Sequence, residues 1–117
     1  MAFKFEKLIA WQKAMDFADH IHGLVKDNFP KEEKYILTPQ IERAANSIVL
    51  NIAEGCTGQS NATFKLFLNY SLRSAIEVVS CLFIARRRVY INEQVFKTSY
   101  QECEELTKII TALRNSI

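Results

Sequence analysis

Two glutamates carry side chains that could do chemistry. Glu54 follows Asn51 near the end of the largely apolar stretch 47–55 (SIVLNIAEG), and Glu77 lies in a later helical segment. Two carboxylates on neighbouring helices could bind a metal ion or act as an acid–base pair. Di-iron helix bundles, however, use two Glu-x-x-His motifs, and the sequence contains none. We therefore expect no metal, no cofactor and no catalytic pair of glutamates.

The other reactive side chains show no catalytic pattern. His20 and His22 are two positions apart, so a helix points them in different directions. Cys81 and Cys103 fall on apolar helical stripes, which is typical of small core residues. Cys56 follows a helix end, but the sequence identifies no base that would activate its thiol. The sequence also lacks GxSxG, P-loop and GxGxxG motifs. We expect a protein that is not an enzyme and has no small-molecule substrate; catalysis by Cys56 or the glutamates is the alternative.

The polar residues around position 50 have a structural interpretation as well. About 100° separates successive residues of a helix, so these side chains form one stripe beside an apolar face. Half-buried polar groups need hydrogen-bond partners. We expect Asn51 and Glu54 to bond to the backbone or to Ser74, and Glu77 to pair with Arg43. The predicted polar seam between helices comprises Gln40, Arg43, Ser47, Asn51, Glu54, Ser74 and Glu77.

Basic residues offer a second kind of site. The run 86–88 is three consecutive arginines at the end of a predicted helix. Cations there complement the negative helix terminus, which is one interpretation. The other is a patch that contacts phosphates and positions RNA or DNA without reading bases. The candidate nucleic-acid-binding residues are Arg73, Arg86, Arg87, Arg88 and Lys97.

Four segments with helical periodicity must position these side chains. Apolar residues recur at steps of three and four in each segment, which predicts one buried face per helix. Short connections make consecutive helices antiparallel neighbours. The sequence thus predicts an all-α fold, an antiparallel up-down-up-down four-helix bundle in a single domain of residues 1–117. The expected helices span about 5–29, 38–55, 60–89 and 92–117.

Start and stop signals set these boundaries. Thr38 followed by Pro39 predicts the start of the second helix, with a capping hydroxyl and a proline at the first helical position. Gly55 is expected to cap the end of that helix in the left-handed conformation, which glycine adopts without penalty. Ser60 and Asn92 are expected to cap the starts of the third and fourth helices.

Composition limits the function classes. Hydrophobic residues make up 49% of the 117 residues and charged residues 24%, which excludes a disordered chain. The net charge of +2 is too small to indicate nucleic-acid binding by itself. Three cysteines without a CxxC pair are typical of reduced thiols in the cytoplasm. No signal peptide or membrane-length apolar run is apparent, so we expect no membrane partner.

Aromatic residues are more numerous than four narrow core stripes require. The chain has eight phenylalanines, four tyrosines and one tryptophan. Of these, Phe67, Tyr70 and Phe83 lie off the main face of the third helix. Soluble monomers avoid large exposed apolar patches, so such residues favour a protein–protein interface. We expect the protein to self-associate.

Taken together, these motifs resemble one bacterial family, the four-helix-bundle proteins encoded in 23S rRNA intervening sequences. The resemblance rests on FEKLIAWQKA from Phe5 and on FPKEEKYILTPQIERAANSIVLNIAEG from Phe29, and covers nearly the whole chain. One departure is Arg73, which stands where the family tends to have a glycine that permits close helix contact. The remaining shared positions are Ser60, Phe64, Phe67, Leu68, Ser74 and Glu77.

The resemblance has functional implications. It implies a homopentameric ring, and kinship with the accessory variability determinant of diversity-generating retroelements, which binds a reverse transcriptase and nucleic acid. It implies no catalytic activity, and it makes Asn51, Glu54 and Gly55 scaffold positions. The first hypothesis is therefore an oligomeric adaptor that binds RNA, DNA or a nucleic-acid-handling protein through a basic surface. The alternative is a structural protein–protein interaction module with no nucleic-acid role.

Overall fold

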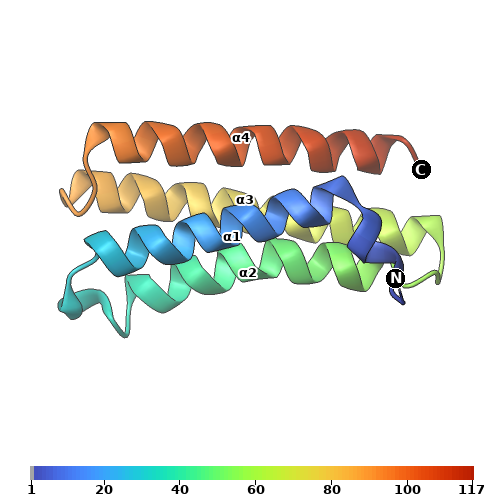
Figure 1. Ribbon diagram of the computed structural model, residues 1–117, viewed down its shortest axis with the longest axis horizontal. Helices are drawn as coiled ribbons and strands as arrows, with labels where there is room; N and C mark the ends of the chain where they lie inside the picture. The colour runs from blue at the N-terminus through green and yellow to red at the C-terminus, as the bar shows by residue number, and fades with distance from the viewer. Residues whose placement is uncertain (1) are drawn as a thin grey trace.

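The helices alternate in direction along the long axis of the molecule. The computed structural model describes residues 2–117, and these contain four α-helices and two short 3₁₀ helices but no β-strand. Both termini lie at one end of an elongated bundle of 43 × 23 × 23 Å (Figure 1). This confirms the predicted all-α four-helix bundle. The elements are η1 (Lys4–Lys7), α1 (Ile9–Asn28), η2 (Lys31–Glu33), α2 (Leu37–Gly55), α3 (Asn61–Arg87) and α4 (Glu93–Asn115).

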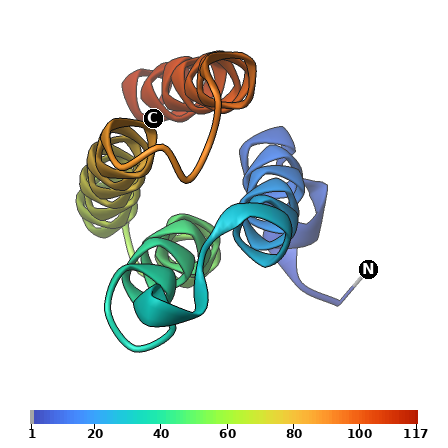
Figure 2. The ribbon, with the colours of Figure 1, turned by 90° about the vertical axis from the view of Figure 1, so that its left-hand side faces the viewer.

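The four helices surround a common axis (Figure 2). Each helix contributes buried apolar residues to the core that lies between them. In α2 the apolar residues at helical spacing are all buried, as the periodicity predicts: Ile41, Ala44, Ala45, Ile48 and Ile52. Burial of such side chains is the main favourable contribution to folding. Fully buried large residues include Phe17 and Ile21 from α1, Ile41, Ile48 and Ile52 from α2, Leu68 and Leu82 from α3, and Ile110 from α4.

The first helix begins later than the sequence predicts. Residues Lys4–Lys7 form a 3₁₀ turn, and α1 starts only at Ile9. The Glu6 carboxylate accepts a 3.1 Å hydrogen bond from the backbone N–H of Phe3, which stabilises this separate turn. The apolar spacing of this segment predicts a buried face of Met15, Ala18, Ile21, Leu24 and Val25, and all of these but Met15 are buried. Met15 is 38% exposed, while its neighbour Ala14 is fully buried.

The second helix does not begin at Thr38. It starts at Leu37, and Thr38 and Pro39 lie inside its first turn. Proline is tolerated there because the first four N–H groups of a helix have no partner within it. The carboxylate of Glu33 accepts a 3.2 Å hydrogen bond from the Leu37 N–H instead. A carboxylate four positions upstream therefore replaces the expected hydroxyl cap.

Gly55 ends α2 for a reason other than the predicted one. Its φ is not positive; the positive-φ glycine in the described residues is Gly58, in the following connection. A Cβ atom on Gly55 would lie 2.6 Å from the Cβ of Phe67. Gly55 therefore permits close approach of α2 to α3, and the left-handed helix cap assigned to it from sequence is wrong.

The predicted caps of α3 and α4 are confirmed. The Ser60 hydroxyl accepts a 3.0 Å hydrogen bond from the backbone N–H of Thr63, and the Asn92 side chain accepts one of 2.8 Å from Val95. These bonds satisfy first-turn N–H groups that otherwise lack a partner.

The C-terminal end of α3 has an unusual backbone. The helix ends at Arg87, and Val89 then adopts φ 62°, in the left-handed region. The N–H of Val89 donates to the carbonyl of Arg86 at 3.0 Å, and the N–H of Tyr90 to that of Ala85 at 2.9 Å. This pair of bonds is the Schellman motif, which usually has glycine in the left-handed position. A β-branched residue there is a strained exception.

Candidate functional site

The structure brings together three of the seven residues of the predicted polar seam. The side-chain amide of Asn51 donates to the carbonyl and to the hydroxyl of Ser47, at 2.8 and 2.9 Å. The hydroxyl of Ser74 donates to that of Ser47 at 3.0 Å, which links α3 to α2. A further link comes from the fully buried Ser71, whose hydroxyl donates to the carbonyl of Ile48 at 2.9 Å. Ser71 is not among the polar residues that the sequence singles out, because it falls at the spacing of the buried face of α3.

The other four residues of the predicted seam, Gln40, Arg43, Glu54 and Glu77, are exposed. Within residues 2–117, no hydrogen bond or ion pair joins Arg43 to Glu77 or Glu54 to Ser74. Long side chains at the edge of a helix stripe can remain hydrated instead of crossing to the next helix. Arg43, Glu54 and exposed Leu50 line a shallow groove on the outer surface of α2.

Two of the five candidate basic residues have partners within the bundle. The Arg86 guanidinium contacts the carboxylate of Glu93 at 3.2 Å and lies over the ring of Phe96, 3.9 Å from its centre. Arg88 donates to the carboxylate of Glu33 at 3.2 Å. The other three, Arg73, Arg87 and Lys97, are exposed. Arg86 and Arg88 therefore have structural partners, and the phosphate-contacting interpretation stays a prediction.

Glu33 has a structural role that the sequence does not indicate. Its carboxylate is buried and accepts a 2.7 Å hydrogen bond from the Tyr90 hydroxyl, besides those from Arg88 and the Leu37 N–H. The hydrogen bond from Tyr90, followed by the Leu37 N–H and Arg88, lowers the pKa of Glu33 against the opposing effect of burial. The same bond raises the pKa of Tyr90. We call these four residues the Glu33 cluster; it joins the α1–α2 and α3–α4 connections.

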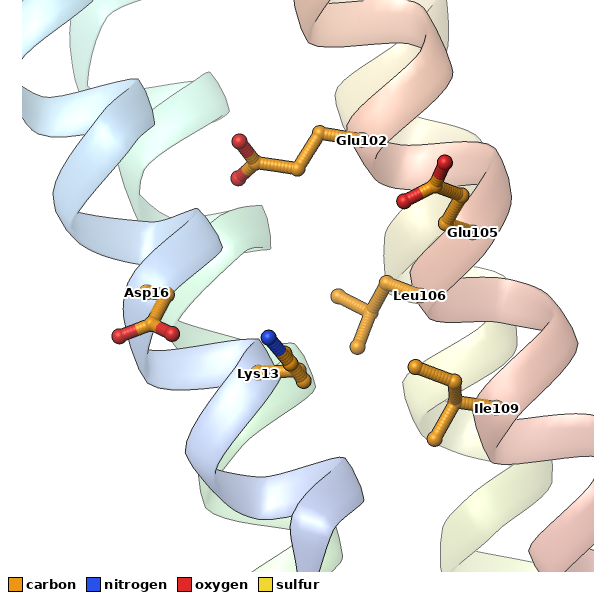
Figure 3. A pocket seen from close by; sticks show the side chains of 6 residues that line it. All are labelled: Lys13, Asp16, Glu102, Glu105, Leu106 and Ile109. Carbon is orange, nitrogen blue, oxygen red and sulfur yellow. The ribbon is translucent and has the colours of Figure 1, made fainter.

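A small cavity lies between α1 and α4 (Figure 3). Its volume is about 280 Å³. In Figure 3, Lys13 and Asp16 come from α1, and Glu102 and Glu105 come from α4. Burial raises the pKa of Glu102; Asp16 and Glu105 add to this, while His20 and Lys13 oppose it. The apolar part of the lining is Leu106 and Ile109.

Above this cavity, a histidine links α1 to α4. The Nε2 atom of His20 lies 2.8 Å from the Ser99 hydroxyl, and its Nδ1 atom lies 4.0 Å from the Glu102 carboxylate. The order serine–histidine–carboxylate is that of a hydrolytic triad. Ser99 is fully buried, however, so an acyl group cannot reach its hydroxyl. The distance of 4.0 Å is also too long for a hydrogen bond. The contact joins two helices and is not a catalytic arrangement.

Metal and thiol chemistry receive no support from the described residues. Within residues 2–117, no group of three or more His, Cys, Asp or Glu side chains is placed to hold a metal ion. Burial raises the pKa of Cys81 to about 11 and that of Cys103 to about 12, which keeps both thiols protonated at neutral pH. Cys56 is half-buried after the end of α2.

The outer surface shared by α3 and α4 is apolar. Ile76 is 66% exposed and Phe83 45% exposed, and Tyr100 of α4 lies with its ring centre 6.3 Å from that of Phe83. A groove of about 350 Å³ runs between the two helices at this point. We call this surface the α3–α4 apolar face; it consists of Ile76, Val79, Phe83 and Tyr100.

Helix α3 is strongly apolar, yet only part of it is buried in the bundle. It is the one helix in the described chain that is long and apolar enough to cross a membrane, by length and composition only. A third of that apolar window is buried inside the bundle. The core helix of a soluble protein can pass the same test, but such a helix is mostly buried. Much of the apolar surface of α3 therefore lacks a partner within a single chain.

The sequence matches the family described as 23S rRNA-intervening sequence protein over residues 6–112. The chain belongs to this family. A crystal structure from Bacteroides thetaiotaomicron, described as a protein with unknown function from the S23 ribosomal protein family, is 27% identical in sequence. The similarity covers 91% of this chain and 98% of that one, with a TM-score of 0.83. Among curated proteins, no sequence matches. Family membership confirms the resemblance that the sequence motifs indicate, and neither description names an activity.

Proposed function

We propose that the protein is a non-enzymatic adaptor that works as a homo-oligomer and associates through the α3–α4 apolar face. The observation that carries this proposal is the exposure of Ile76, Phe83 and Tyr100 side by side on two adjacent helices. Contiguous apolar surface of this kind on a soluble protein usually marks an interaction site. The resemblance to ring-forming relatives favours a pentamer.

Nucleic-acid binding is the second part of the proposal. Arg73, Arg87 and Lys97 are exposed and could contact phosphates. Arg88 has a partner but is still 55% exposed in its side chain. The small net charge of the chain means that oligomerisation would have to bring several such patches together. A structural interaction module without nucleic acid is the competing function. We also infer a cytoplasmic location, where three free cysteines remain reduced.

The interface is tested with a matched pair of charge substitutions. Ile76→Glu places a carboxylate in the α3–α4 apolar face, and Ile9→Glu places one at a similarly exposed position at the start of α1, 64% exposed. We expect sedimentation equilibrium to show an assembly for the unmodified protein and for Ile9→Glu, but smaller species for Ile76→Glu. Equal masses for both variants would contradict this interface.

RNA binding is tested by its dependence on salt. Each phosphate contact releases counterions, so the affinity should fall steeply as salt rises, and Arg87→Ala should reduce that slope. Arg114→Ala is the matched control, because Arg114 lies near the other end of the bundle and bonds to Asn69. RNA binding that is absent at low salt would favour the structural module.

A further inference from the structure

At one end of the bundle, three apolar side chains are exposed to solvent. Tyr35 and Ile36 follow η2 in the α1–α2 connection and are 84% and 66% exposed, and Val89 in the α3–α4 connection is 83% exposed. Both connections lie at the end away from the termini (Figure 1). The Glu33 cluster joins the two connections, so these side chains project from one rigid end. We call Tyr35, Ile36 and Val89 the apolar tip.

Val89 is the most informative member of the apolar tip. Its backbone is in the left-handed region, where a β-branched residue is strained and glycine is usual. Its side chain lies almost entirely in water, so packing in the core does not explain the valine. Strain that is kept without a folding benefit points to a function for the residue that carries it.

The apolar tip is surrounded by positive charge. Segments 29–36 and 86–93 contain five basic and three acidic residues, whereas the rest of the chain has ten of each. Two of these acidic residues are paired with arginines, Glu33 with Arg88 and Glu93 with Arg86. Lys31, Lys34 and Arg87 are exposed on the same two segments. The positive excess of the whole chain is therefore gathered at this end.

We propose that this end of the bundle docks on an anionic membrane surface. Aliphatic and tyrosine side chains enter the boundary between headgroups and acyl chains, and lysines and arginines contact anionic headgroups. This combination fits exposed Ile36 and Val89 together with Lys31, Lys34 and Arg87, which are exposed on the same two segments. The role is peripheral docking, and it is independent of oligomerisation through the α3–α4 apolar face.

A lipid surface fits the apolar tip better than a nucleic acid does. Bases stack on free aromatic faces, but the ammonium group of Lys34 lies over the Tyr35 ring, 5.5 Å from its centre. Ile36 and Val89 offer no aromatic face at all. The expectation of no membrane partner from sequence concerns segments that span a bilayer, whereas this tip forms only when two distant connections meet.

Vesicle flotation tests the proposal. We expect the protein to float with vesicles of phosphatidylcholine and phosphatidylglycerol in equal parts, to stay unbound with phosphatidylcholine alone, and to dissociate as salt rises. The triple variant Tyr35→Ser, Ile36→Ser, Val89→Gly should lower the partition coefficient at least about tenfold, because it removes the inserting groups. All three positions are exposed, so the variant should keep the fold, which its thermal unfolding by circular dichroism checks.

Matched controls distinguish binding by the apolar tip from nonspecific adsorption to vesicles. Ile9→Ser with Leu50→Ser removes apolar side chains that are 64% and 63% exposed elsewhere, and vesicle binding should be unchanged. Lys31→Glu with Lys34→Glu should abolish binding without touching the apolar groups, whereas Lys65→Glu with Lys108→Glu should reduce it less. No binding to anionic vesicles would overturn the proposal. So would equal binding to neutral vesicles, equal losses in the controls, or a triple variant that loses RNA binding but keeps vesicle binding.

Discussion

The hydroxyl of Tyr90 donates a 2.7 Å hydrogen bond to the carboxylate of Glu33, and this bond joins two connections that are far apart in the sequence. Arg88 and the first N–H of α2 bind the same carboxylate. One buried acidic side chain therefore starts a helix, fixes the turn after α3 and holds one end of the bundle together.

Replacing Glu33 should make the stability of the protein less dependent on pH. The pKa of Glu33 is lowered in the folded protein, so its stabilising effect is present above the unfolded pKa and is lost as pH falls through the folded pKa. We expect Glu33→Gln to be less stable than the unmodified protein at neutral pH, and the difference to shrink in acid. Urea unfolding across the acid range measures it.

Glu32→Gln is the control for this prediction, because Glu32 is an exposed neighbour in the same 3₁₀ turn. It should leave the pH profile unchanged. A loss of stability in Glu33→Gln that stays constant from neutral to acid pH would mean that the charge of Glu33 has no part in the cluster.

Adding a methyl group at Gly55 should destabilise the protein. The new Cβ would meet the Cβ of Phe67 at 2.6 Å, and overpacking of this kind costs about 1–3 kcal/mol. Gly23→Ala is the opposite case: a Cβ there meets no atom within 4 Å, and alanine favours the helix by about 1 kcal/mol. In chemical denaturation, the free energy of unfolding should fall for Gly55→Ala and rise for Gly23→Ala. A stable Gly55→Ala would show that α2 and α3 can separate at little cost.

Val89→Gly should raise the free energy of unfolding by about 1 kcal/mol, because glycine adopts the left-handed conformation without strain. Val89→Ala tests the cause, since alanine keeps the Cβ that creates the strain and should bring no comparable gain. Thermal unfolding of both variants measures the effect. A larger gain from alanine than from glycine would point to removal of the exposed side chain as the cause.

The three thiols should differ in reactivity. Burial keeps Cys81 and Cys103 protonated at neutral pH, so iodoacetamide should leave both unmodified in the folded protein and modify them in urea. Mass spectrometry of the digested protein measures the extent of modification at each cysteine. Cys56 should react no faster than free cysteine; a much faster reaction would support the alternative of a catalytic thiol.

The fold could be predicted because its signals are local. The spacing of Ile41, Ile48 and Ile52 depends only on neighbours along one helix, and the caps at Ser60 and Asn92 depend on residues three positions away. Such patterns are readable without coordinates. The bundle topology then follows from the short connections between the helices.

The contacts at the sites could not be predicted because they join distant segments. Glu33 accepts its hydrogen bond from Tyr90, which is 57 positions away in the sequence. The residues next to Glu33 are typical of an exposed turn and do not indicate that its carboxylate is buried. The sequence suggests a helix cap for Gly55. Its actual role, close contact with Phe67 of the next helix, cannot be foreseen from neighbouring residues. Arg86 and Arg88 look alike in sequence, yet they bind different carboxylates at the two sides of one turn.

The mass of the protein in solution decides whether the chain self-associates. Light scattering during size-exclusion chromatography reports mass independently of shape, which matters for an elongated bundle. We expect an assembly of several 13.5 kDa chains, with five favoured, that persists on dilution. A mass of 13.5 kDa at every concentration would contradict self-association through the α3–α4 apolar face, and with it the oligomeric adaptor.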